Sequence, residues 1–185
     1  MKNKMLLIPL TSIAIPLICI AISIALSPWF SITGNALSDL GHAINSRASP
    51  IFNFGLSLGG TLIIVTAVTI IIRTSKALAI SMSVAGYTLI LVAVFDEMYN
   101  RYGRLHFWVS AAFFLSLVAS LVIYSLTTAN KIKKILSLAL LAAGVTSWVL
   151  HLFYKMPPGA AISELISIFI IIPFYIDAVI KALKK

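Results

Sequence analysis

Six long apolar stretches, separated by short polar segments, dominate the pattern of the chain. Each approaches the roughly 20 residues that an α-helix needs to cross a hydrocarbon core of about 30 Å. The pattern predicts spanning helices at Met5–Leu26, Ile51–Ile72, Leu78–Phe95, Leu105–Thr127, Ile135–Phe153 and Ala160–Ile180. The first stretch is too long for a signal-peptide core, so we expect an uncleaved anchor. The chain is therefore expected to be an all-α, polytopic membrane protein with a single six-helix domain over residues 1–185.

The segment between the first two predicted spans, Ser27–Pro50, carries a weaker helical pattern. Apolar residues recur there at helical spacing and polar residues occupy the other face: Leu37, Leu40 and Ile44 against Ser38, Asp39 and His42. The pattern predicts a short amphipathic outer helix over Asn35–Asn45. Because Gly41 weakens that helix, we expect it to lie on the membrane or to fold back into the bundle.

Composition agrees with a membrane protein, since 61% of the residues are hydrophobic and 10% are charged. A soluble domain of this size needs more charge to cover its surface. By itself, the formal net charge of +9 is compatible with a nucleic-acid partner. The basic residues lie in inter-helix loops and at the termini, however, where they indicate membrane orientation and no nucleic acid. Cys19 is the single cysteine, so no intramolecular disulfide can form.

The basic residues divide unequally between the two sides of the predicted helix ladder. Ten lie on the side shared by both termini: Lys2, Lys4, Arg73, Lys76, Lys131, Lys133, Lys134, Lys181, Lys184 and Lys185. The other four are Arg47, Arg101, Arg104 and Lys155. The excess predicts a multi-pass protein of the cell membrane with both termini in the cytoplasm. Trp29, Trp108 and Trp148 all fall near the outer helix ends, as interfacial anchors do.

Chemically versatile residues gather on the opposite, outer side, which holds four of the five acids and all three histidines. Candidates for a site there are Ser38, Asp39, His42, Asn53, Asp96, Glu97, His106, His151 and Glu164. Ionisable groups at membrane depth usually face a bundle interior or a wet cavity. Glu164 is the most informative, because it lies about one turn into the sixth predicted helix. If the helix ends surround one another, these residues share one outward-facing pocket.

The leading hypothesis is that this pocket binds or acts on a lipid or lipid-linked small molecule, with membrane lipids as partners. Asp39 and Glu164 are the acid–base candidates and His106 is the candidate proton shuttle. Further binding candidates are Ser38, His42, Asn53, Asp96 and His151. The alternative for the same residues is structural: they cap helices, pair with Arg101 and Arg104, and hold loops together. We favour that alternative for Asp96 and Glu97, and whether the protein is an enzyme stays open.

Two other function classes remain open. An ion or small-solute transporter or channel needs polar groups that continue to the inner face. The spans carry mainly Ser, Thr and Tyr, and Asp177, the acid near the inner end, is expected to pair with Lys181 one turn on. The protein could also be a non-catalytic assembly or sensor protein, and it could form a homo-oligomer.

No cofactor is predicted, although a metal ion stays an alternative. The three histidines with Asp39 could bind zinc, but the sequence contains no H-E-x-x-H or paired-cysteine spacing. A nucleophilic triad on Ser38 lacks the G-x-S-x-G pattern. Haem between His106 and His151 would lack a second ligand pair.

The assembled residues resemble the prokaryotic membrane protein family called domain of unknown function 998. The likeness covers nearly the whole chain and rests on Asn35–Gly41 (Asn-Ala-Leu-Ser-Asp-Leu-Gly), Ile51-Phe52-Asn53, Phe95-Asp96-Glu97, His106 and Gly159…Glu164. The resemblance implies a six-helix membrane fold with no established activity. It favours Asp39, Asn53, His106 and Glu164 as site members. Leu165 stands where family members often carry a basic residue, which removes any pairing role at that position.

Overall fold

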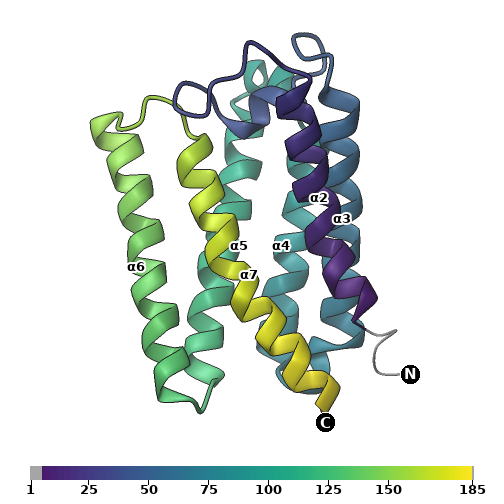
Figure 1. The fold of residues 1–185 in the computed structure, drawn as a ribbon, viewed down its shortest axis with the longest axis vertical. Helices are drawn as coiled ribbons and strands as arrows, with labels where there is room; N and C mark the ends of the chain where they lie inside the picture. The colour runs from purple at the N-terminus through teal and green to yellow at the C-terminus, as the bar shows by residue number, and fades with distance from the viewer. Residues whose placement is uncertain (1–5, 185) are drawn as a thin grey trace.

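The structure, a computed structural model, describes residues 6–184. Within this range six helices are long and apolar enough to cross a membrane. They are α2 (Leu7–Ala25), α3 (Ser49–Thr69), α4 (Lys76–Val94), α5 (Leu105–Thr127), α6 (Lys131–Tyr154) and α7 (Ala161–Lys184), which run side by side as a bundle (Figure 1). For the described residues, the prediction of an all-α fold with six helices of spanning length and apolarity is confirmed. Met5, at which the first span was predicted to begin, and Lys2, Lys4 and Lys185 lie outside the described residues.

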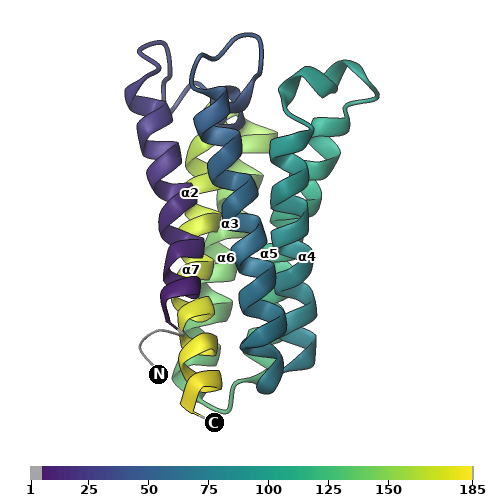
Figure 2. The ribbon, with the colours of Figure 1, turned by 90° about the vertical axis from the view of Figure 1, so that its right-hand side faces the viewer.

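The two ends of the bundle differ in their connections. One end, here called the loop-rich end, carries residues 26–48, 95–104 and 155–160 (Figure 2). It includes the short 3-10 helices η1 (Leu37–Gly41) and η3 (Glu97–Arg101). The other end, here called the terminal end, holds the start of α2, the finish of α7 and the 3-10 helix η2 (Ile71–Arg73). Most of the candidate site residues therefore lie at or near the loop-rich end.

The predicted amphipathic helix over Asn35–Asn45 is not supported, because the segment forms only the five-residue turn η1. Local side-chain hydrogen bonds compete with a longer helix here. The Asp39 carboxylate accepts from the backbone N–H of Ala36 at 3.0 Å, and Nδ1 of His42 accepts from the backbone N–H groups of Ile44 and Asn45. Leu37 and Leu40 are buried in the bundle core. The turn is therefore folded into the protein.

Close helix contacts at glycine hold α2, α3 and α4 together. A Cβ atom at Gly59 would lie 2.8 Å from Cγ of Pro16 on α2, and one at Gly55 would collide with Cys19. On the other side of α3, a Cβ at Gly60 would lie 2.5 Å from the carbonyl oxygen of Gly86 on α4. Small residues allow membrane helices to approach closely, because van der Waals contact replaces the hydrophobic effect there. The close packing of α3 on α2 therefore depends on Gly55 and Gly59.

Helix α6 stands apart and packs mainly on α5 and α7 (Figure 1). Side-chain hydrogen bonds attach it toward the loop-rich end, where Ser147 donates to Ser163 at 2.8 Å and Trp148 Nε1 donates to Ser167 at 2.9 Å. At the terminal end, Nζ of Lys133 lies 2.5 Å from the carboxylate of Asp177. Between these polar contacts, a cavity separates part of α6 from α5 and α7.

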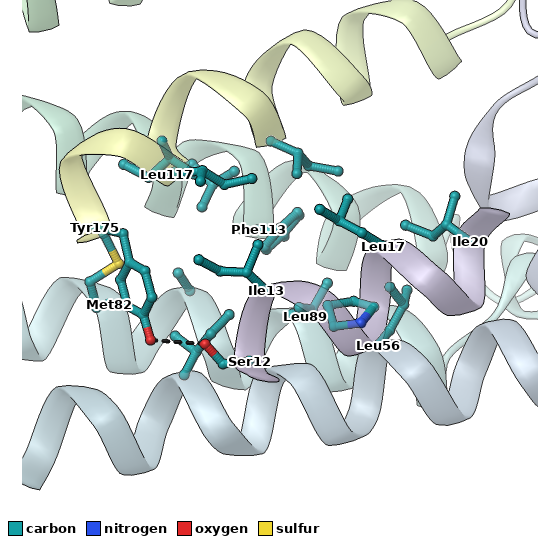
Figure 3. A pocket seen from close by; sticks show the side chains of 16 residues that line it. Ser12, Ile13, Leu17, Ile20, Leu56, Met82, Leu89, Phe113, Leu117 and Tyr175 are labelled. Atoms are coloured by element: carbon teal, nitrogen blue, oxygen red, sulfur yellow. Dashed lines mark hydrogen bonds between the residues drawn. The ribbon is translucent and has the colours of Figure 1, made fainter. Parts of the chain in front are cut away.

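A small apolar cavity of about 90 Å³ lies among the other five long helices (Figure 3). Its lining side chains include Leu17, Leu56, Met82 and Phe113, and only a hydrogen bond of 2.9 Å between Ser12 and Tyr175 adds polar groups. Empty apolar cavities stay dry, since water needs polar partners. This cavity offers no acid–base chemistry.

The close approach at Gly60 yields a stability prediction. Gly60→Leu forces a side chain into the Gly86 carbonyl, so we expect it to lower the free energy of unfolding in detergent by about 1–3 kcal/mol or more. Thermal unfolding of the purified protein measures this. Val68→Leu is the matched control, because Val68 lies on the same helix and is exposed. Equal melting temperatures for the two variants would contradict the packing role of Gly60.

Candidate functional site

A cavity of about 490 Å³ lies between α5, α6 and α7 and extends inward from the loop-rich end. Its polar lining groups are concentrated there and comprise Ser38, Glu97, Asn100, His106, Ser110, Trp148, His151, Glu164 and Ser167. Farther along, the lining is apolar and includes Leu117, Val118, Leu121, Leu140, Leu141, Ile170 and Ile171. The cavity is thus polar at one end and apolar at the other.

Glu164, in the first turn of α7, is buried at the polar end with 7% of its surface exposed. The backbone N–H of Leu37 donates to its Oε2 at 2.6 Å, and its Oε1 accepts no hydrogen bond from the described residues. Two backbone bonds bring Leu37 there: Gly159 N–H donates to Thr33 O at 2.8 Å and Ala161 N–H donates to Asn35 O at 3.0 Å.

Gly159 makes this crossing possible, because a Cβ atom there would collide with the backbone of Asn35. This close backbone contact explains why position 159, shortly before Glu164, is a glycine. The segment 31–37 can cross the start of α7 only where no side chain intervenes. The crossing determines which backbone donor meets the Glu164 carboxylate.

Glu97 and His106 form the second part of the site. Ser38 Oγ donates to Glu97 Oε1 at 3.0 Å, and His106 Nε2 lies 3.8 Å from the same oxygen. His106 Nδ1 lies 2.7 Å from the carbonyl oxygen of Phe95. Because a carbonyl only accepts, Nδ1 carries the proton and donates, which leaves Nε2 as the acceptor nitrogen. Ser110 Oγ, 3.3 Å away, donates to that nitrogen.

The environment of Glu97 has a clear effect on its titration. Burial raises the pKa of the Glu97 carboxyl to about 7, and the nearby negative charge of Asp39 adds to the rise. In residues 6–184, no Lys or Arg forms an ion pair with Glu97, and the nearest basic group is the neutral His106 ring, whose Nε2 lies 3.8 Å away. A carboxyl with a pKa near neutrality beside a histidine acceptor nitrogen is suited to proton transfer.

Asp39 and Asp96 frame the cavity without lining it. Asp39 Oδ2 accepts from the Asn35 side chain at 2.9 Å in addition to the Ala36 N–H, and so caps η1. Asp96 accepts from the backbone N–H groups of Met98 and Ala43, both at 2.9 Å. Asp96 thereby ties η3 to the segment after η1.

Asn53 and His42 also lie outside the lining, whereas His151 belongs to it. Asn53 Nδ2 donates to the Gly41 carbonyl at 2.9 Å, and a Cβ at Gly41 would lie 2.6 Å from Asn53 Oδ1. That oxygen is buried and has no partner among the described residues. His151 Nδ1 donates to the Pro157 carbonyl at 3.0 Å, and its ring lies against Trp148.

The structure therefore brings Ser38, His106, His151 and Glu164 to one cavity and places Asp39, His42, Asn53 and Asp96 around it. Glu97 also lines the cavity, although the sequence favoured a structural role for it. Arg101, four residues on, suggested an ion pair, but its Nε donates to the Met98 carbonyl at 3.2 Å. The useful signal was the position of Glu97 directly after the predicted third span.

In residues 6–184, no three His, Cys, Asp or Glu side chains are grouped closely enough to hold a metal ion. Asp39 and His42 are engaged in η1 and the turn that follows it, and neither lines the cavity that His106 and His151 share. The structure thus gathers no ligand set for the zinc alternative, which stays a prediction from composition.

The raised pKa of Glu97 makes stability depend on pH in a defined direction. The unfolded chain releases this proton near the ordinary pKa of 4.5, whereas the folded protein keeps it up to about 7. As pH rises from 4.5 to about 7, the wild type should therefore lose stability relative to Glu97→Gln. Below this window the stabilities of the two proteins should be most similar. Melting temperatures across the window measure the effect, with Asn100→Gln as the non-titrating control. Parallel profiles for wild type and Glu97→Gln would contradict it.

Comparison with known proteins identifies the family but no activity. The family model described as "Protein of unknown function (DUF998)" matches residues 11–177, which include all the candidate site residues. No curated protein and no solved structure matches the chain. The match covers most of the chain, and the resemblance noted in the sequence is confirmed. The chain belongs to the DUF998 family of proteins of unknown function.

Proposed function

We propose that the protein binds and acts on a lipid or lipid-linked small molecule in the cavity between α5, α6 and α7. The head of this ligand lies among Glu97, His106 and Glu164, and its apolar part extends between the helices. The observation that carries the proposal is the division of one continuous cavity into a polar end and an apolar remainder. An amphiphile is the class of molecule that matches both parts.

The dimensions of the cavity suit one extended chain. Along α5 the lining runs from His106 to Leu121, and fifteen residues at the helical rise of about 1.5 Å span about 22 Å. That length exceeds half of a hydrocarbon core of about 30 Å. The volume of about 490 Å³ falls in the range of roughly 300–1,000 Å³ typical of small-molecule pockets.

The cavity ends before the terminal end, which favours a binding pocket over a channel. One turn past its last lining residues, the three helices present Tyr124, Ser137 and Phe174, all buried. Beyond them Asp177 accepts from Tyr124 Oη and pairs with Lys133 and with Lys181, at 2.5, 2.5 and 2.8 Å. A conducting path needs polar lining throughout, and these groups are already paired.

The side of the cavity between α5 and α6 gives an apolar chain a route from the membrane. Leu115 on α5 and Val149 and Leu152 on α6 line the cavity and are also exposed, by 66%, 40% and 49%. Exposed apolar side chains on membrane helices face lipid. A lipid can therefore enter sideways between these two helices without crossing water.

For the chemistry, Glu97 and His106 form the proton-transfer pair and Glu164 the second acid–base group. Glu97 takes the place beside His106 that the sequence suggested for Asp39, because the Asp39 carboxylate caps η1. Asp39 and Asn53 position the turn that carries Leu37 and Ser38 to the head of the ligand.

Filling the cavity tests the proposal. Val118→Trp places an indole in the apolar part, so we expect lipid that co-purifies with the wild type to be lost. Leu126→Trp is the control, because Leu126 lies on the same helix, is exposed and does not line the cavity. Mass spectrometry of the purified proteins measures bound lipid. Equal lipid content in the two variants would overturn the proposal.

The same measurement on whole membranes separates catalysis from binding. His106→Ala and Glu164→Ala should change the lipid profile of cells that express the protein if the site is catalytic. Unchanged profiles with retained lipid binding would assign the site to binding alone.

We further propose that the protein resides in the cell membrane with its terminal end in the cytoplasm, because of the excess of basic residues there. In a Cys19→Ser background, an impermeant maleimide should label Asn45→Cys in intact cells and Ala129→Cys only after permeabilisation. Asn45 and Ala129 are both exposed and lie at opposite ends. The reverse labelling would invert the orientation.

A further inference from the structure

The polar end of the cavity contains hydrogen-bond acceptors and acidic side chains. Glu97 and Glu164 line it, and Asp39 lies close by. In the described part of the chain, no Lys or Arg lines this cavity. Glu164 is more than nine-tenths buried and lines the cavity, and its Oε1 accepts no hydrogen bond from residues 6–184. The site thus combines an enclosed volume with a buried acceptor directed into it.

The buried donors around this acceptor are already used. The Leu37 N–H donates to Glu164, Ser38 Oγ to Glu97, and His106 Nδ1 to the Phe95 carbonyl. Likewise, Trp148 Nε1 donates to Ser167 and His151 Nδ1 to the Pro157 carbonyl. The Asn100 amide is a further donor, at the exposed rim. A ligand head must therefore bring donors of its own.

We propose, building on the proposed function, that the ligand is a single-chain amphiphile with an amine head group, held as an ammonium by Glu164 and Glu97. An ammonium has three donors and no acceptor, which complements carboxylate oxygens that only accept. A charge taken out of water needs a partner of opposite sign, and these carboxylates supply it. A phosphate head would bring negative charge against two carboxylates and find no free buried donor.

Basic residues near the rim of the cavity could attract an anionic head group in place of an amine. The Arg104 guanidinium lies over the Phe107 ring, 4.5 Å from its centroid, and Phe107 lines the cavity. Arg101 and Arg104 are both exposed. An anionic head would remain with them at the surface and leave the buried carboxylates unpaired. The amine instead reaches the interior of the site.

Tryptophan fluorescence can measure head-group preference directly, because Trp148 lines the cavity. In a Trp29→Phe, Trp108→Phe background, Trp148 is the sole tryptophan. The probes are brominated alkyl chains of equal length that end in an amine, an alcohol or a phosphate. We expect saturable quenching by the amine at concentrations about tenfold or more below those of the other two probes, a difference of about 1.4 kcal/mol per tenfold.

Replacing single carboxylates by amides tests whether the preference for the amine arises at the polar end of the cavity. Glu164→Gln should lower the affinity for the amine about tenfold and leave the affinity for the alcohol unchanged, which also shows that the pocket is intact. Asp177→Asn, the same chemical change on the same helix at the terminal end, should leave the amine preference unchanged.

The outcomes separate this inference from the proposed function. Alcohol or phosphate binding as tightly as the amine overturns the head-group assignment and leaves an amphiphile pocket. A preference for the amine that survives Glu164→Gln combined with Glu97→Gln also overturns the assignment. Quenching by no probe, or quenching insensitive to Val118→Phe, which fills the cavity without adding a second tryptophan, overturns both.

Discussion

The hydrogen bond from the backbone N–H of Leu37 to the Glu164 carboxylate connects the two parts of the chain on which the site depends. It requires segment 31–37 to cross the start of α7, and the crossing requires a glycine at position 159. A buried carboxylate is costly without hydrogen bonds, so the crossing also stabilises Glu164 where it lies. Once η1 is held there, Ser38 reaches Glu97 and Glu97 reaches His106. The polar end of the cavity therefore follows from one backbone contact.

The cavity itself follows from how membrane helices associate. Helices α2, α3 and α4 pack closely at Gly59, Gly60 and Gly86, where small residues permit backbone contact. Helix α6 has few such contacts, and polar side chains near both of its ends attach it to α7. In lipid the apolar faces between those links gain little from closing together, because lipid tails solvate them equally well. The space beside α6 can thus persist and accept an apolar chain.

The local pattern of apolar and polar residues predicted the long helices well and the segments between them poorly. The helical spacing of Leu37, Leu40 and Ile44 suggested an amphipathic helix, but Asp39 and His42 bond to nearby backbone groups and end the turn at Gly41. Glu97 was assigned a structural role because charged residues in loops are normally solvated. The structure turns Arg101 toward a carbonyl and places Glu97 beside His106. Both differences arise because side-chain competition within a loop has no periodic signature.

Hydropathy and the distribution of residue types were sufficient for the spans and for the expectation that Glu164 and His106 share one end. These properties depend on the bilayer, which imposes a length and a polarity on each segment independently of its neighbours. Only the tertiary structure decided that Glu97 lines the cavity while Asp39 caps a turn, that the cavity lies beside α6, and that it ends above Tyr124. Those facts depend on which side chains from distant segments meet, and contacts of that kind are set by packing in three dimensions.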